Sequence, residues 1–200
     1  MLIHSDNLKI LSVASTEEGR YALKGIHVDK DKGRVYATDG KCLVEMNLPD
    51  QELEKDFPNV LNIGDKDPAT SFLIPSNIVM ALQKSFRENS KPALPILKYA
   101  QIKTNDKGTF VGTTNLETNH ISKLPEDIQG PDIDKVYPKE DDKVFEITIN
   151  KEVLQNVLDA LPDESDIDFS FFGNKRPVVF NVKVGDNKYK GALMPIDPTK

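Results

Sequence analysis

Few residues in this sequence have the types and spacing that chemistry requires. Its three histidines, His4, His27 and His120, lie far apart and lack the spacing of metal ligands, and the single cysteine, Cys42, cannot build a zinc site. His27 falls in a predicted strand, where an ordinary hydrogen-bonded histidine is more common than a ligand. The sequence therefore predicts no metal site and no cofactor.

Two acidic motifs could take part in chemistry but are better explained as turns. Asp29-x-Asp31-x-Gly33 begins like a calcium loop but lacks the bidentate acid that closes one, so we expect a hairpin turn. Thr38-Asp39-Gly40 could hold a catalytic aspartate, but no nucleophile, base or phosphate-binding glycine pattern accompanies it. We expect Asp39 to bond local backbone and Gly40 to adopt a positive φ. The residues alone therefore show no catalytic constellation.

Composition indicates a folded protein of a reducing compartment. Hydrophobic residues make up 38% of the chain and charged residues 29%, which suffices for a core. No apolar run is long enough to span a membrane, Met1 to Asp6 lack the pattern of a secretion signal, and the single cysteine fits a cytoplasmic location. The net charge of −6 argues against tight nonspecific binding of duplex DNA, although a locally basic face could still enclose DNA loosely.

The elements that must position these residues repeat along the chain as strand, helix and three strands. Predicted helices begin near Asp6, Ser76 and Asn150, a spacing of 70 and then 74 residues, which exceeds a solenoid period and suits a duplicated supersecondary unit. Alternating apolar residues predict strands at 2–4, 21–28, 34–38 and 41–48, then 72–75, 97–104, 108–114 and 117–124, then 144–149, 167–172, 177–184 and 189–195.

The predicted helices from Ser76 to Arg87 and from Asn150 to Leu161 are amphipathic, so each should pack one face on a sheet. This predicts an α+β fold. Pro49 to Pro68 and Pro125 to Lys143 are acidic and rich in proline, which is typical of connecting segments. We predict a domain over 1–130 made of two units, 1–68 and 69–130, then a connector over 131–143 and a third unit over 144–200.

Five short motifs occur in the order in which a known family has them. Arg20-Tyr21-Ala22-Leu23-Lys24-Gly25 is similar to R-x-x-L-x-G, and Ala37-Thr38-Asp39-Gly40-Lys41-Cys42-Leu43 to A-T-D-G-H-R-L. Ile74-Pro75 leads a helix, Gly130 to Val136 is similar to G-x-F-P-D-Y-x-x-V with one residue deleted, and Tyr189 to Ile196 is similar to a strand ending in M-P-M-R. Through these motifs nearly the whole chain resembles the bacterial DNA sliding clamp, the beta subunit of DNA polymerase III.

The resemblance implies a sliding-clamp-like fold built from three strand-helix-three-strand units. Family members have three domains of two units each, and this chain resembles their middle domain joined to the last half of the third. Much of the family's subunit interface lies in the parts without a counterpart here. Lys41-Cys42 stand where the family usually has His-Arg, and Asp197 stands where it has a terminal Arg.

The resemblance also implies a protein-binding groove, which in the family lies between the middle domain and the last half of the third. By motif position its residues here are Leu23, Thr38, Gly40, Lys41, Cys42, Leu43, Pro131, Lys135, Val136, Asn150, Val153, Met194, Pro195 and Ile196. Apolar residues among them would hold a leucine or phenylalanine side chain of a peptide. Ordinary packing at a domain boundary is the alternative explanation.

In function, the resemblance implies an accessory factor that tethers a DNA polymerase or another replication protein through a short linear peptide motif. If a ring forms, it would encircle double-stranded DNA, with Lys9, Lys84, Arg87 and Lys151 facing the phosphates. One alternative is a clamp-derived peptide-binding or decoy module, of phage or mobile-element origin, that does not encircle DNA. An unrelated enzyme acting on a small ligand is the third.

Oligomeric state follows from the same resemblance. The unpaired edges of the first and third units could join copies head to tail into a tetrameric ring, and the apolar helix face with Val153, Val157 and Leu161 would need a cover. Because the family's interface segments are missing and the bore would carry few cations, a monomer or weak dimer is favoured over the ring. No membrane partner is expected.

Overall fold

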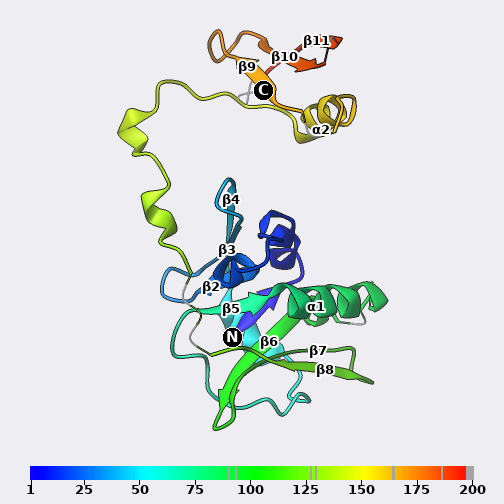
Figure 1. Cartoon of the computed structure of the whole chain (residues 1–200). Coiled ribbons are helices and arrows are strands. Elements are labelled where there is room, and N and C mark those ends of the chain that lie inside the picture. The colour runs from blue at the N-terminus through cyan, green and yellow to red at the C-terminus, as the bar shows by residue number, and fades with distance from the viewer. Residues whose placement is uncertain are drawn as a thin grey trace. The chain divides into compact units, whose positions relative to one another are not determined.

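The computed structural model describes residues 1–89, 91–92, 94–126, 128, 130–163, 165–185 and 187–196. The chain divides into two compact units, residues 1–132 (unit 1) and 133–200 (unit 2) (Figure 1). The predicted boundary after residue 130 and the connector over 131–143 stay predictions. None of the described helices has the length and apolar composition needed to cross a membrane.

Unit 1 holds two half-units, each an opening strand, a helix and three further strands. The first comprises β1 (Leu2–His4), the 3₁₀ helix η1 (Asn7–Val13), β2 (Gly25–Asp29), β3 (Arg34–Thr38) and β4 (Leu43–Asn47). The second comprises β5 (Phe72–Pro75), α1 (Ser76–Glu88), β6 (Tyr99–Asn105), β7 (Gly108–Thr114) and β8 (Asn119–Lys123). Three further 3₁₀ helices are short: η2 (Tyr21–Leu23) precedes β2, η3 (Gln51–Asp56) lies between the half-units, and η4 (Pro95–Lys98) precedes β6.

The two half-units exchange their opening strands. Sheet A has the order β1-β6-β7-β8, so β1 of the first half-unit pairs with the second, with Ile3 opposite Ala100. Sheet B has the order β4-β3-β2-β5, so β5 of the second half-unit pairs with the first, with Ile26 opposite Ile74. The pairs within both sheets are antiparallel. Neither sheet is complete without the other half-unit.

One hydrophobic core joins the exchanged strands to the helices. Ile3, Ile26, Ile74 and Ala100 are all fully buried in the same cluster. Val79 and Leu82 of α1 and Leu8 and Ile10 of η1 pack into this cluster, as the apolar face predicted for α1 requires. Gln83 Nε2 donates a 2.8 Å hydrogen bond to the Leu8 carbonyl and so ties α1 directly to η1.

Three element predictions are wrong in part. The first helix is 3₁₀, because its amides bond three residues back, and Asn7 accepts from the His4 amide and donates to the Asn47 carbonyl, which fixes its first turn. The strand predicted from Tyr21 begins only at Gly25, since Leu23 and Lys24 bond back to the Arg20 and Tyr21 carbonyls in a turn. Within the described residues, 144–149 forms no strand.

The segment from Pro49 to Pro68, predicted as a plain connecting loop, covers the outer face of sheet A. Its Phe57, Leu61 and Ile63 form a second apolar cluster with Leu2 of β1. Gln51 Oε1 accepts from the Leu2 amide at 2.7 Å, and the Thr104 amide donates to the Lys66 carbonyl at 2.8 Å. The prediction missed this cover because its apolar residues follow neither strand nor helix spacing.

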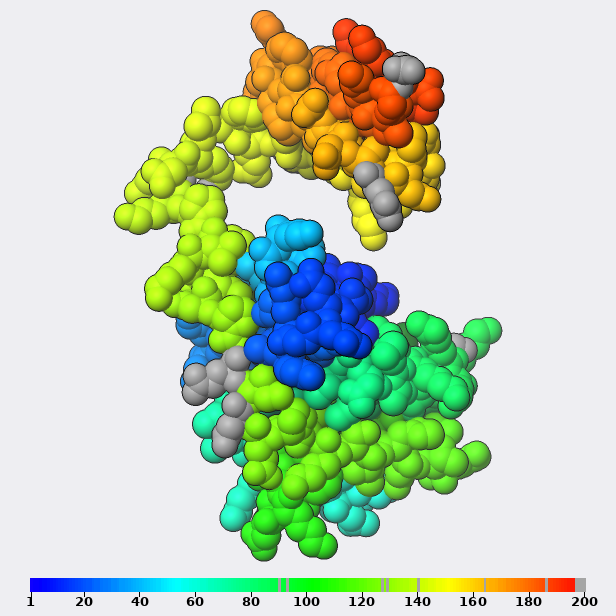
Figure 2. All heavy atoms as spheres, in the orientation of Figure 1, coloured from blue at the N-terminus to red at the C-terminus, as the bar shows by residue number. Residues whose placement is uncertain are grey.

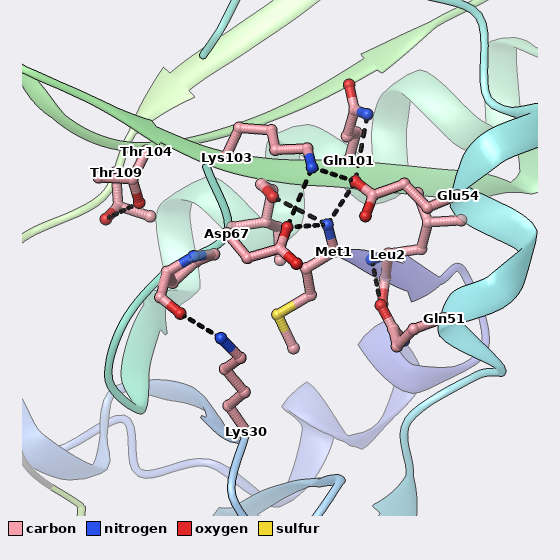
Figure 3. Close-up of polar contacts among 12 residues, drawn as sticks. Met1, Leu2, Lys30, Gln51, Glu54, Asp67, Gln101, Lys103, Thr104 and Thr109 are labelled. Carbon is pink, nitrogen blue, oxygen red and sulfur yellow. Dashed lines mark hydrogen bonds and ion pairs between the residues drawn. The ribbon is translucent and has the colours of Figure 1, made fainter. Parts of the chain in front are cut away.

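A charge cluster fastens this cover to sheet A (Figure 3). The Met1 ammonium pairs with Glu54 and with Asp67, and Lys103 Nζ of β6 lies 2.9 Å from Glu54 and 3.0 Å from Asp67. Partial burial raises the pKa of both carboxyl groups, but hydrogen bonds from the Met1 ammonium and from Lys103 outweigh it and hold each pKa below its usual value. Two cations thus balance two anions at this position.

Unit 2 contains a third half-unit, which is the gold-to-red body in Figure 2. It contains α2 (Lys151–Asp159), β9 (Ile167–Ser170), β10 (Val178–Val184) and β11 (Asn187–Leu193), preceded by short 3₁₀ helices η5 (Ile133–Lys135) and η6 (Glu140–Asp142). Its sheet C has the order β11-β10-β9 and is antiparallel. The buried core is small and centres on Val178, Phe180 and Leu193.

Replacing Lys103 by methionine should destabilise unit 1 by about 1–3 kcal/mol at neutral pH, because two partly buried carboxylates lose one of their two cations. The depressed pKa values mean that this contribution is present above about pH 4.5 and is lost as the pH falls, so the difference from wild type should shrink in acid. Native-state amide exchange of β6 at several pH values measures this difference in the free energy of unfolding.

The matched control is Lys123→Met in β8, whose exposed pair with Glu126 spans 3.5 Å and should contribute less than about 1 kcal/mol. The assigned role of the cluster would be contradicted if both variants lowered the free energy of unfolding equally, or if the effect of Lys103→Met grew in acid.

Candidate functional site

The turn from Thr38 to Leu43 is held by hydrogen bonds from its own side chains. Thr38 Oγ1 donates to the Cys42 carbonyl at 2.6 Å and accepts from the Gly40 amide at 3.0 Å. Asp39 Oδ1 accepts from the amides of Lys41 and Cys42 at 2.8 and 2.9 Å, and Gly40 has φ +90°. The interpretation of Asp39 as a turn residue is confirmed.

Electrostatics at this turn give no sign of a reactive group. Hydrogen bonds from the Cys42 and Lys41 amides lower the pKa of Asp39 to about 2, so it is an anion that serves the backbone. Desolvation, and then the Asp39 carboxylate 3.3 Å from Sγ, raise the pKa of the exposed Cys42 thiol, which is the opposite of what a nucleophile needs. Arg20 Nη1 donates to the Asp39 carbonyl at 3.0 Å and joins the two motifs of the first half-unit.

Pro131 is brought to sheet B by an aromatic pair. The rings of His27 (β2) and Tyr36 (β3) stack at 5.0 Å, and Tyr36 Oη donates to the Pro131 carbonyl at 3.1 Å. A Cβ on Gly130 would lie 2.1 Å from Tyr36 Oη and 2.6 Å from His27 Nδ1, so only glycine fits there. Tyr36 and Thr38 lie on the same face of β3, so Pro131 contacts the face of sheet B on which Thr38 begins the turn.

His27 packs within unit 1 as a hydrogen-bonded histidine. Its Nε2 contacts the Ala22 carbonyl, and burial lowers its pKa, which keeps the ring neutral. No three His, Cys, Asp or Glu side chains come together as a metal site in the described part of the chain. Asp29 likewise serves the β2–β3 hairpin, where it accepts from the Lys32 amide at 3.2 Å, as predicted.

Five predicted groove residues of unit 1, Thr38 and Gly40 to Leu43, thus lie on or next to one turn. Leu23 and Leu43 are half-buried, Thr38 pairs with Leu43 across β3 and β4, and Lys41 and Cys42 are exposed at the turn. We call Leu23, Thr38–Leu43 and Pro131 the unit 1 half-site. Sequence reasoning missed Arg20, Tyr36 and Gly130 as its supports, although Arg20 and Gly130 stand in the recognised motifs.

Unit 2 places five of its predicted residues at the start of α2 and just after β11. Asn150 caps α2, its Oδ1 accepting from the amides of Glu152 and Val153 at 2.8 and 3.1 Å. The Ile196 amide donates to the Thr148 carbonyl at 2.8 Å, which places the segment after β11 beside the segment that leads into α2. Met194 is 65% exposed and Ile196 44% exposed. We call Asn150, Val153 and Met194–Ile196 the unit 2 half-site.

Two further predicted residues, Lys135 and Val136, lie at and just after η5. Val136 is 65% exposed, and its amide donates to the Ile133 carbonyl at 3.0 Å. Asp197 lies outside the described residues.

Two of the four predicted DNA-facing residues border one cavity in unit 1. A cavity of about 710 Å³ lies between η1 and α1, and Lys9, Lys24 and Arg87 line it together with Ser15, Ser76 and Gln83 but no acidic residue. Lys9 pairs with Asp6 at 2.6 Å, whereas no ion pair of Lys24 or Arg87 occurs among the described residues. Lys84 pairs with Glu88 at 3.9 Å on α1 and is not in the lining, and Lys151 begins α2 of unit 2. Sequence reasoning missed Lys24.

Comparisons with known proteins support this geometry through structure alone. No family model matches the sequence, and no curated protein does. The beta sliding clamp of C. crescentus matches with a TM-score of 0.63 at 16% identity, over 98% of this chain and 50% of that one. The Bacillus subtilis DNA polymerase sliding clamp matches with a TM-score of 0.63 at 20% identity, over 98% and 48%. The Streptococcus pyogenes DNA polymerase beta subunit matches with a TM-score of 0.63 at 14% identity, over 98% of this chain and 50% of that one.

At these identities the likeness shows the fold. The chain has the α+β fold of the bacterial sliding clamps, as the motifs predicted, and spans about half the length of those chains.

The Asp39 carboxyl should titrate with a midpoint near pH 2 instead of its usual 3.8. Because the folded pKa is depressed, its bonds to Lys41 and Cys42 stabilise the turn above the usual pKa and are lost as the pH falls through about 2. Amide shifts of Lys41 and Cys42 in NMR spectra report this, with Asp39→Asn as the control that cannot titrate. A midpoint at or above 3.8 would show that these bonds are absent in solution.

Proposed function

We propose that this chain is a non-enzymatic accessory factor that binds short linear peptide motifs of a DNA polymerase or another replication protein. The observation that carries the proposal is the fold of the bacterial sliding clamps, in which most motif residues of both half-sites are half-buried or exposed. Two of the known structures that it resembles are DNA polymerase sliding clamps by name.

The half-sites have the chemistry of peptide-anchoring surfaces. Leu23 and Leu43 offer half-buried apolar area on unit 1, and Met194 and Ile196 offer exposed apolar area on unit 2. Methionine adapts to differently shaped partners, and apolar anchors give most of the affinity of such contacts. The hydrogen-bonded turn around Asp39 and the Asn150 cap fix the backbone beneath these side chains, so little ordering free energy is lost on binding.

For DNA, we propose that the cavity between η1 and α1 contacts phosphates. Lys24, Arg87 and several hydroxyl groups, with no acid in the lining, suit an anion, whereas the net charge of −6 opposes binding elsewhere. The alternative, a peptide-binding or decoy module that does not encircle DNA, uses the same half-sites and differs in having no function for this cavity.

A peptide with a glutamine followed by leucine and phenylalanine anchors should bind the full chain at micromolar affinity, about −8 kcal/mol. Leu23→Glu and Met194→Glu should each weaken binding at least about tenfold, because each replaces an apolar anchor by a charge. Calorimetry measures both. Leu94→Glu and Met80→Glu, at exposed apolar positions outside the half-sites, are the controls. Unchanged affinity for both half-site variants would disprove the proposed sites.

Binding to short duplex DNA at low salt should depend on Lys24 and Arg87. If each contacts a phosphate, the slope of log affinity against log salt should fall by about 0.9 per residue in Lys24→Gln/Arg87→Gln. Lys55→Gln/Lys107→Gln removes the same charge from exposed positions outside the cavity and should change the slope little. Equal slopes for both double variants, measured by fluorescence anisotropy, would favour the module that does not encircle DNA.

A further inference from the structure

We propose that two copies of this chain associate through unit 2, by exchanging residues 144–149 in the way that the half-units of unit 1 exchange β1 and β5. The segment 144–149 of one copy would add to β9 of the other, and the reverse, in a symmetric contact. This inference concerns the assembly of the chain and does not rest on the proposed function.

Unit 2 is the half-unit whose exchange partner is missing from the described structure. In unit 1 the opening strand β5 is buried at Phe72, Leu73 and Ile74, whereas Val144 is 91% exposed and no residue of 144–149 is buried. The same contrast holds for the strand after each helix, since β2 buries four of its five residues and β9 none. The helices show the same contrast, because Val79 and Leu82 of α1 are buried and no residue of α2 is.

The segment 144–149 already occupies the place of an opening strand. In unit 1 the end of β5 lies beside the end of β8, since Pro75, Lys123 and Leu124 line one surface pocket. In unit 2 the Ile196 amide bonds the Thr148 carbonyl at 2.8 Å, in the corresponding position after β11. Ile147 and Ile149 pack against the core of sheet C as Phe72 and Ile74 pack in unit 1. Phe145 of the segment lies against Phe171 with ring centroids 6.0 Å apart, and no described strand pairs with the segment.

β9 offers the strand edge that such a segment needs. It is the terminal strand of sheet C, in the position that β2 and β6 hold in sheets B and A, where each accepts an opening strand. Phe169, Phe171 and Phe172 crowd this end of the sheet and are 39%, 48% and 56% exposed. An edge strand with exposed aromatic residues is a site for pairing with another strand.

The helix side of unit 2 is also uncovered. A cavity of about 570 Å³ beside α2 is lined by Val153, Val157 and Leu161 together with Phe180 and Tyr189. In unit 1, Gln83 on the neighbouring side of α1 bonds the Leu8 carbonyl of η1. When the two helices are aligned on their N-caps Pro75 and Asn150, the counterpart of Gln83 is Leu158, which is 40% exposed. A second α2 would cover this side.

A second copy is the occupant that fits both the unpaired segment and the unpaired edge. The half-units of unit 1 already fill each other's edges, so neither offers a free opening strand. Unit 2 carries both the segment to donate and the edge to accept it, and so is complementary to itself. Such a surface produces a closed pair related by a two-fold axis. A unit of this size with so small a core also gains much of its stability from association.

Unit 1 predicts the register. There Ile26 and Ile74 face the core and pair, His27 lies opposite Leu73, and the Ser76 amide bonds the Lys24 carbonyl at 2.9 Å. Residues 24, 26 and 28 thus carry the hydrogen bonds to β5, and His27–Leu73 is a non-hydrogen-bonded pair.

In unit 2, Ile149 precedes the helix cap as Ile74 does, and Ile167 is the first core-facing residue of β9. Thr148 turns its carbonyl toward Ile196, so the backbone of Ile147 and Ile149 faces the free side. Thr148 of one copy should therefore lie opposite Asp168 of the other, as a close non-hydrogen-bonded pair.

An interchain disulfide tests this pairing in the full chain. In a Cys42→Ser background, Thr148→Cys/Asp168→Cys should convert most of the protein to a covalent dimer, twice 22.4 kDa, under mild oxidation. The matched control is Thr148→Cys/Asn181→Cys. Asn181 lies opposite Asp168 on the far side of β9, so its Cα would be about 10 Å from that of Thr148 and too far for a disulfide. It should stay uncrosslinked.

Sedimentation of the unmodified chain gives the second measurement. The mass should shift from that of one chain to that of two as the concentration rises. Phe169→Lys should raise the concentration at which half of the chains are dimeric at least about tenfold, because it places a charge at the pairing edge. Ile121→Lys, at a similarly exposed position on β8, the terminal strand of sheet A, should leave this concentration unchanged.

A chain that stays monomeric at all concentrations overturns the proposal. So does a dimer in which the Thr148→Cys/Asp168→Cys variant fails to crosslink, since its contact would lie elsewhere. Neither outcome bears on peptide binding by the half-sites.

Discussion

The exchange of opening strands is the constraint on which the structure of unit 1 depends. β1 and β5 each leave their own half-unit and complete the other's sheet, and their apolar residues close a single core beneath α1 and η1. The half-units therefore cannot fold independently without leaving two unpaired sheet edges and an open core. The outer cover from Pro49 to Pro68 and the charge cluster around Lys103 are secondary to this, since both are built on the β1–β6 pair.

The local elements could be predicted from the sequence because their signals are local. The strands β3, β5 and β7 and the amphipathic face of α1 follow directly from residue alternation and helical spacing. What could not be predicted depends on distant partners. Nothing within 144–149 distinguishes a segment that has a strand beside it from one that has none, and the 3₁₀ form of η1 depends on the bond from Asn7 to Asn47.

The candidate site divides in the same way. The Thr38–Leu43 turn could be predicted because Asp39 and Gly40 act within a few residues of themselves. The supports of the site could not, because the fit of Gly130 against the stacked rings of His27 and Tyr36 joins segments that lie far apart in the sequence. Lys24 was missed for the same reason, since the cavity that it shares with Arg87 forms only when η1 and α1 pack together. The motif residues of both half-sites are thus local features, whereas the supports of the unit 1 half-site come from the fold.

The most direct test of strand exchange as the organising constraint is amide hydrogen exchange of the full chain at a series of dilutions. We expect the amides of β2 and β6 that face β5 and β1 to stay protected at every concentration, because both partners belong to one chain. The amides of Ile147, Ile149 and β9 should be protected only at concentrations where two copies associate. Protection of 144–149 and β9 that is equal at all dilutions, or absent at all of them, would contradict the account.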